Sequence, residues 1–197
     1  MSWSLFLLLH AGAFGLAAVL ARLLLAYRRS GVLPLSLGRT ASARGLVAHG
    51  FYLWLPLADL LFLLCYALGG DAVAPLWHGG WPPALRWIGA ALLLAALVQV
   101  VSAQAAMGRD WRMGVDEAAG AGLRTGGPFA RSRHPVYLGI RATLLAQLLV
   151  TGSWPMLVLW LLSELLVQLQ ARFEEEAMEA RFGQAYRDYC RAVRRWL

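Results

Sequence analysis

Two short polar clusters in this sequence contain residue types that could do chemistry. The first, Arg131–Gly139, reads RSRHPVYLG. Pro135 suits the first turn of a helix, where a backbone N–H is not needed. The N–H groups after it lack intrahelical partners and carry the positive end of the helix dipole, and Arg133 and His134 flank them. This arrangement predicts a binding site for a carboxylate or phosphate. The alternative is that the basic residues only anchor the start of a helix at the membrane surface.

The second cluster, Glu174-Glu175, is brought to the same depth by the chain between them. Gly and Pro in the segment Thr151–Pro155 indicate a tight turn between two helices. Pro135 lies 19 residues before Trp154, and the glutamates follow directly after the residue 19 positions beyond it. Because antiparallel helices rise equally per residue, the carboxylates are expected beside the start of the first helix. A basic face opposite an acidic one suits a zwitterionic or cationic ligand; a solvated acidic run is the alternative.

The helical period indicates which glutamate faces inward. Glu175, Met178 and Phe182 recur at helical spacing, whereas Glu176 and Glu179 lie off this stripe. Glu175 is therefore the first choice for a carboxylate in the pocket and Glu174 the second.

The composition predicts that membrane-spanning helices position these clusters. Hydrophobic residues make up 59% of the 197 residues and charged residues 15%, with a mean hydropathy of +0.56. This leaves too little polar surface for a water-facing globule. We expect a single all-α integral-membrane domain over residues 1–197, with three spans in 1–107 and the chemistry in 108–197. The five apolar runs long enough for spans, or nearly so, are Trp3–Tyr27, Leu46–Leu68, Ala84–Met107, Val136–Val150 and Trp154–Leu169.

The arginines predict the orientation in the membrane. The chain has 18 basic residues, all Arg, and a net charge of +7. They gather in every second connecting segment: Arg28, Arg29, Arg39 and Arg44 after the first span, Arg109, Arg112, Arg124, Arg131 and Arg133 after the third, and Arg172, Arg181, Arg187, Arg191, Arg194 and Arg195 after the fifth. Because basic segments stay in the cytoplasm, the N-terminus is expected outside and the C-terminus inside. Anionic lipid headgroups, rather than nucleic acid, are the expected counterpart.

The tail after Gly183 is predicted to be an amphipathic cytoplasmic helix. Apolar and aromatic residues recur along one side, and Arg187, Arg191, Arg194 and Arg195 lie mostly on the other. Such a helix rests on an anionic leaflet. Within the hairpin, Arg141 and Glu164 are expected to form an ion pair between adjacent helices, with a contact to substrate as the alternative. The two cysteines lie at different depths, so neither a disulfide nor a metal site is expected.

Residues Arg133–Gly139, followed after the hairpin by Glu174-Glu175 and by the aromatic tail, resemble the isoprenylcysteine carboxyl methyltransferase family and its bacterial relatives. The resemblance covers roughly Met107–Leu197. It implies an integral-membrane enzyme that uses S-adenosylmethionine. The cofactor-binding residues it implies are Arg133, His134, Pro135, Tyr137, Leu138, Gly139, Glu174 and Glu175. It further implies catalytic roles for Arg172 and Glu175. Family members often carry Arg where this chain has Gln170, and Arg172 lies nearby.

The expected function is methylation of a membrane-partitioned acceptor, an isoprenoid or lipid carboxylate, amine or thiol. The expected location is a bacterial inner membrane, since a chain rich in Arg and free of Lys suggests a GC-rich bacterial genome. The alternatives are an NADPH-dependent reductase of the sterol-reductase kind and a non-catalytic membrane protein. The short chain and the paired glutamates favour the methyltransferase. The sequence leaves the acceptor and the oligomeric state open.

Overall fold

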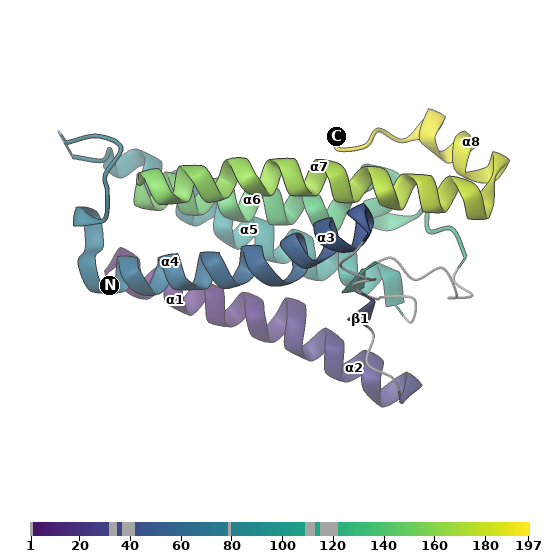
Figure 1. The fold of residues 1–197 in the computed structure, drawn as a ribbon, viewed down its shortest axis with the longest axis horizontal. Helices are drawn as coiled ribbons and strands as arrows, with labels where there is room; N and C mark the ends of the chain where they lie inside the picture. Colours follow the sequence, from purple (N-terminus) through teal and green to yellow (C-terminus); the bar gives the residue numbers. More distant parts are fainter. Residues whose placement is uncertain (1, 32–34, 37–41, 79, 109–112, 115–121) are drawn as a thin grey trace.

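Long apolar helices make up most of the chain in the computed structural model, which describes residues 2–31, 35–36, 42–78, 80–108, 113–114 and 122–197 (Figure 1). Four helices are long and apolar enough to cross a membrane: Trp3–Arg28, Ala43–Ala72, Pro83–Met107 and Trp154–Phe182. Pro135–Thr151 is a shorter apolar helix. The expectation of an apolar helical bundle is confirmed, and the count of five spans stays a prediction. Of the arginines used for orientation, Arg39, Arg109 and Arg112 lie outside the described residues.

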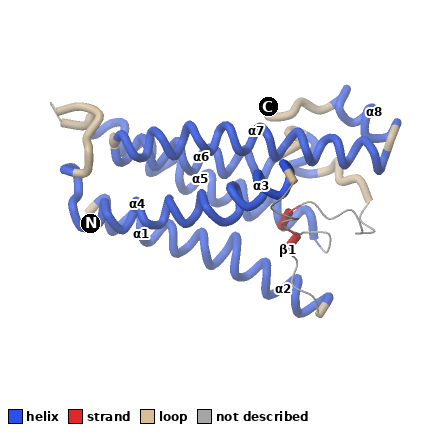
Figure 2. Tube along the Cα trace, viewed as in Figure 1, coloured by secondary structure: helices blue, strands red, loops and turns tan. Residues whose placement is uncertain are grey.

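The helices lie roughly side by side, and loops join them at the two ends of the bundle (Figure 2). Helix α5 packs on α6, α6 on α7, and α4 on both α1 and α7. In chain order the elements are α1 (Trp3–Phe14), the π-helical turn η1 (Gly15–Leu20), α2 (Ala21–Ser30), β1 (Leu35–Ser36), α3 (Ala43–His49), the π-helical turn η2 (Gly50–Trp54), α4 (Leu55–Gly69), the 3-10 turn η3 (Gly70–Ala72), α5 (Pro83–Met107), β2 (Met113–Gly114), the 3-10 turn η5 (Gly127–Ala130), α6 (Pro135–Thr151), α7 (Trp154–Phe182) and α8 (Gln184–Ala192).

Two short β pairings interrupt the helical structure among the described residues: a parallel pairing of β1 with β2, and an isolated antiparallel bridge between Pro75 and Ser153. Leu35 pairs with Met113, and Ser36 with Gly114. The β1–β2 pairing joins the segment after the first long helix to the segment after α5. These two segments therefore lie at the same end of the bundle, as the alternating arginines predict.

The turn between α6 and α7 depends on a glycine. Gly152 has a φ of +58°, which side chains other than glycine rarely adopt. A Cβ atom on it would also lie 2.2 Å from the ring of Trp81. The Trp81 indole nitrogen donates a hydrogen bond to the Leu149 carbonyl at 2.7 Å, and the Trp154 N–H donates to the Ala74 carbonyl at 2.9 Å. The loop between α4 and α5 therefore holds the hairpin turn that sets the register of α6 against α7.

Helices α5 and α6 approach closely because glycines lie between them. A Cβ atom on Gly89 would lie 2.7 Å from the Ala146 carbonyl oxygen and 2.9 Å from Val150 Cγ2. A Cβ atom on Gly139 would lie 2.5 Å from Val100 Cγ2. Small residues allow this approach in membrane helices, where packing rather than water exclusion drives association. The contact fixes the position of α6 against α5.

Gly89→Ala is expected to lower the free energy of unfolding by about 1–3 kcal/mol, because the α6 backbone cannot move aside cheaply. Thermal unfolding of the purified protein in one detergent measures the effect. Gly12→Ala is the matched control, since a Cβ atom there meets nothing within 4 Å. Equal midpoints for the two variants would contradict the close packing.

The tail is only partly helical. Gly183, at a φ of +54°, ends α7, and α8 follows with Tyr186 and Tyr189 buried. Figure 1 shows the chain turning back along α7 after α8. Val193 is extended at a φ of −126°, and we call the residues 193–197 the C-terminal strap. The Arg133 N–H donates to the Arg194 carbonyl at 3.0 Å, so the strap lies against the start of α6.

Candidate functional site

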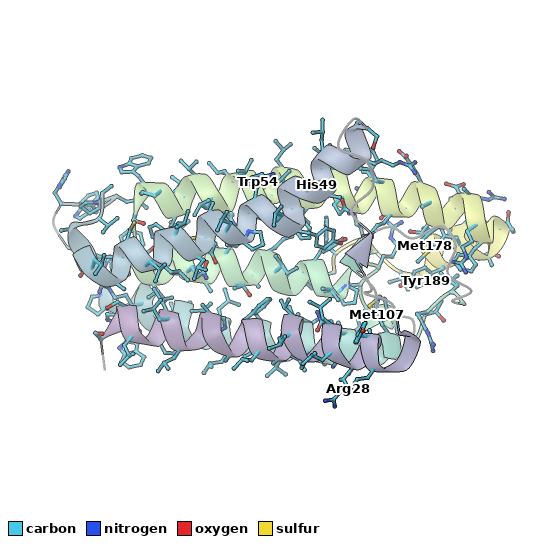
Figure 3. All side chains as sticks on the ribbon, turned by 60° about the horizontal axis from the view of Figure 1, so that its bottom comes forward. Arg28, His49, Trp54, Met107, Met178 and Tyr189 are labelled. Atoms are coloured by element: carbon cyan, nitrogen blue, oxygen red, sulfur yellow. The ribbon has the colours of Figure 1, made fainter. Side chains whose placement is uncertain are left out.

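A cavity of about 960 Å³ begins at the end of the bundle that carries α8 and continues between the helices. Residues from α1, α4, α5, α6, α7 and α8 line it. Figure 3 shows Met107, Met178 and Tyr189, three of the lining residues, gathered at this end of the molecule. The size is ample for a small cofactor.

The two polar clusters meet beside this cavity. Pro135 begins α6, and the His134 ring at its N-cap is 8% exposed. His134 Nε2 lies 3.1 Å from Glu175 Oε1. Because a carboxylate only accepts hydrogen bonds, Nε2 carries the proton. The hairpin geometry expected from the sequence therefore agrees with the structure.

Glu174 is held by hydroxyl and amide donors. The Tyr137 hydroxyl donates to Glu174 Oε1, and Gln170 Nε2 donates to the same oxygen at 3.3 Å. The Tyr52 hydroxyl lies 2.8 Å from that of Tyr137. Since the Tyr137 proton is directed to Glu174, Tyr52 is the donor in this second bond. These hydrogen bonds connect η2 through α6 to α7, and they fix the Glu174 carboxylate at the cavity wall.

Glu175 is neutralised by cations. Arg195 of the C-terminal strap donates two hydrogen bonds to it, at 2.9 Å and 2.6 Å. Arg133 Nη1 lies 3.5 Å from Glu175 Oε1. The hydrogen bond to Glu175 raises the pKa of Arg195, which stays charged. The expectation that Arg195 lies on the solvent side of a tail helix was wrong, because the helix ends at Ala192 and the strap turns inward.

The residues of α8 complete the rim. The Tyr189 hydroxyl donates to the Phe129 carbonyl at 2.7 Å. Burial raises the pKa of Tyr189 to about 12, so it remains a donor at physiological pH. Burial also raises the pKa of Tyr186. Both tyrosines line the cavity and present apolar ring surface to it.

Two groups of opposite charge line the cavity at this end. Arg133 Nε is buried without a hydrogen-bond partner among the described residues, and Arg133 lines the cavity. Glu174 lines the same cavity from α7. Arg133, which has a donor without a partner among the described residues, and the Glu174 carboxylate therefore line one cavity together with Pro135 and Val136 of the first turn of α6.

Only some of the site residues expected from the sequence line the cavity. His134, Pro135 and Tyr137 line the cavity, whereas Leu138, Gly139 and Glu175 are not part of its lining. Gly139 contacts α5 instead. Arg172 is exposed, and the structure does not bring it to the cluster. Its catalytic role stays a prediction without support from the geometry.

Sequence reasoning missed several residues of this site. Gln170 lies one helical turn before Glu174, so the i, i+4 spacing could have indicated its contact. Tyr52 and Arg195 gave no local signal, because they reach the site from distant segments. The Trp196 ring lies 5.8 Å from that of His134.

The ion pair expected between the hairpin helices is confirmed. Arg141 Nε lies 2.9 Å from both carboxylate oxygens of Glu164. The Arg141 guanidinium carbon lies 4.4 Å from the centre of the Trp196 ring. The pair therefore links α6 to α7 and also supports the C-terminal strap.

The fold and the cluster define a bundle of membrane-length helices with a cavity and a cluster of charged residues at one end. Residues 84–185 match the model of the family described as phospholipid methyltransferase. The chain belongs to this family, which is also the family of integral membrane methyltransferases like isoprenylcysteine carboxyl methyltransferase. A comparison with curated proteins found no similar sequence. The family assignment favours a membrane methyltransferase over a reductase or a non-catalytic protein.

Proposed function

We propose that this protein transfers a methyl group from S-adenosylmethionine to a membrane-partitioned acceptor, an isoprenoid or lipid carboxylate, amine or thiol. The observation that carries the proposal is the meeting of Arg133, whose Nε lacks a partner among the described residues, with Glu174 at one cavity. S-adenosylmethionine carries a carboxylate, which needs a cation or N–H donors. Its ammonium group and ribose hydroxyls need hydrogen-bond acceptors. The residues present fit this set.

Each residue has a role in holding the ligand. Arg133 and the N–H groups at the start of α6 would bind the carboxylate. Glu174 would accept hydrogen bonds from the ammonium group or the ribose hydroxyls. Glu175 is a positioning residue, because its carboxylate is occupied by His134 and Arg195. It orients the His134 ring at the cavity wall.

The chemistry demands alignment more than covalent participation by the protein. When bound, the cofactor supplies an electrophilic methyl group. The apolar cavity excludes water and aligns the acceptor with it. A carboxylate acceptor needs no base, whereas a thiol or amine must lose a proton. His134 or Glu174 would take that proton.

The proposed arrangement in the membrane has five spans, with the short helix α6 as the fourth of them in chain order. The N-terminus lies outside a bacterial inner membrane, and the C-terminus with α8 lies in the cytoplasm. The arginines and the β1–β2 pairing, which joins two of the basic segments at one end, support this orientation. The water-soluble cofactor then enters at the α8 end, and the lipophilic acceptor enters from the bilayer. Residues 1–107 contribute three spans and 108–197 the cofactor region of one domain.

Titration of the purified protein with S-adenosylhomocysteine, followed by tryptophan fluorescence, tests the proposal. Trp196 lies close enough to His134 to report binding. Saturable quenching by S-adenosylhomocysteine but not by NADPH is the expected result, and Trp196→Phe should remove most of the signal. Saturable binding of NADPH alone would establish the reductase. Radiolabelled S-adenosylmethionine added to native membrane extract then identifies the methylated product.

A further inference from the structure

The cavity extends well beyond the cofactor site. Four α6 residues at helical spacing line it: Tyr137, Ile140, Leu144 and Gln147. Gln147 comes ten residues after Tyr137, which corresponds to about 15 Å along the helix. Asp59 of α4 lines the cavity together with Gln147. We call Asp59 and Gln147 the distal pair.

The distal pair has unused capacity to accept hydrogen bonds. Gln147 is 2% exposed, and its Nε2 donates to Asp59 Oδ2 at 3.2 Å. That bond fixes the amide orientation, because a carboxylate oxygen needs a donor opposite it. Gln147 Oε1 and Asp59 Oδ1 are both buried without a partner among the described residues.

A third acceptor repeats the pattern nearer the α8 end. Gln104 of α5 is 5% exposed and lines the cavity. Its Nε2 donates to the Ala18 carbonyl at 2.9 Å, which again fixes the amide, and its Oε1 has no partner within the described part of the chain. Within the described residues, the three side-chain oxygens of this lining that lack a partner thus belong to one carboxylate and two amide groups, each of which can accept a hydrogen bond.

Such groups are costly inside a bilayer, and in membrane proteins polar groups at this depth are typical of substrate sites and pathways. The rest of the inner lining is mainly apolar and comes from residues such as Phe51, Leu55 and Leu63. The cavity thus combines a charged entrance, an apolar middle and a far end that accepts hydrogen bonds. An elongated amphiphile has the matching chemistry.

We propose that the methyl acceptor is a long-chain lipid with a hydrogen-bond donor, a hydroxyl or amine, about 15 Å from the group that is methylated. The distal pair accepts a hydrogen bond from this donor. Lipids that carry the donor therefore bind more tightly than lipids of the same length that lack it. The assignment of this lipid as the methyl acceptor rests on the proposed function. Its binding in the cavity is a separate property and is measured without cofactor.

The experiment compares tritiated 1,12-dodecanediol with 1-dodecanol, whose extended chains span about the 15 Å that separates Tyr137 from Gln147 along α6. Each is equilibrated with the protein in nanodiscs, and retention by empty nanodiscs is subtracted. The diol is expected to bind about 10-fold more tightly relative to its partitioning into lipid, because it alone has a donor at each end, whereas the single hydroxyl of 1-dodecanol can reach either the entrance or the distal pair but not both. Asp59→Leu combined with Gln147→Leu should remove this preference.

Gln168→Leu is the matched control, since it removes a glutamine of α7 that is not part of the cavity lining. It should retain the preference for the diol. Equal binding of the two alcohols by the wild-type protein would overturn the inference, even if the double variant fails to fold. A preference that persists in a folded double variant would overturn it as well.

Binding of S-adenosylhomocysteine separates this failure from failure of the proposed function. A protein that binds S-adenosylhomocysteine but shows no preference for the diol would contradict the distal donor alone. A protein that prefers the diol but does not bind S-adenosylhomocysteine would contradict the methyltransferase proposal and support the lipid site.

Discussion

Glu174→Gln is expected to weaken binding of S-adenosylhomocysteine about 10- to 100-fold, because a hydrogen bond to a charged group contributes about 1.5–3 kcal/mol. The glutamine keeps the shape of the side chain and can still accept from the Tyr137 hydroxyl. The protein should therefore remain folded. Isothermal titration calorimetry of the purified variant measures the dissociation constant.

Glu179→Gln is the control for this prediction. Glu179 lies on the same helix but is exposed, with 54% of its side-chain surface accessible, and pairs with Arg187 at 3.2 Å. Exposed ion pairs contribute little, so ligand binding should not change. Equal dissociation constants for the wild type and Glu174→Gln would place the cofactor elsewhere.

Arg195→Ala is expected to lower the free energy of unfolding by about 2 kcal/mol, because it leaves the Glu175 carboxylate with weaker partners. Glu175 has 14% of its side-chain surface exposed, and Arg195 has 30%, so solvent reduces the effect below that of a fully buried pair. Ligand binding should weaken too, since Arg195 no longer holds in place the Glu175 carboxylate that orients His134. Thermal unfolding and calorimetry measure the two effects.

Two further variants separate charge from geometry. Arg195→Lys keeps the charge but cannot form both hydrogen bonds, so it should recover only part of the stability. Arg194→Ala removes the neighbouring exposed arginine and should leave the unfolding midpoint unchanged. Full recovery by lysine would show that charge alone is required. Equal midpoints for Arg194→Ala and Arg195→Ala would remove the role assigned to the strap.

The hairpin illustrates what sequence spacing predicts well. Equal rise per residue on both sides of a short turn places Glu174 and Glu175 beside His134, and the structure agrees. The same reasoning pairs Arg141 with Glu164. It could not anticipate how the two glutamates differ: Glu175, the first choice for the pocket, pairs with Arg195, whereas Glu174 lines the cavity. A helical stripe gives a direction but not the partners that arrive from elsewhere.

The composition and the order of residues by themselves determined the long apolar helices, the hairpin and the acidic and basic residues that meet in it, because these follow from local periodicity and helix rise. The tertiary structure decided that Arg195 reaches Glu175, that Tyr52 reaches Tyr137, and that Asp59 and Gln147 share a cavity wall. Each of these contacts joins segments far apart in the chain. Their positions depend on the packing of whole helices and on a tail that leaves its helix at Val193, which no local pattern encodes.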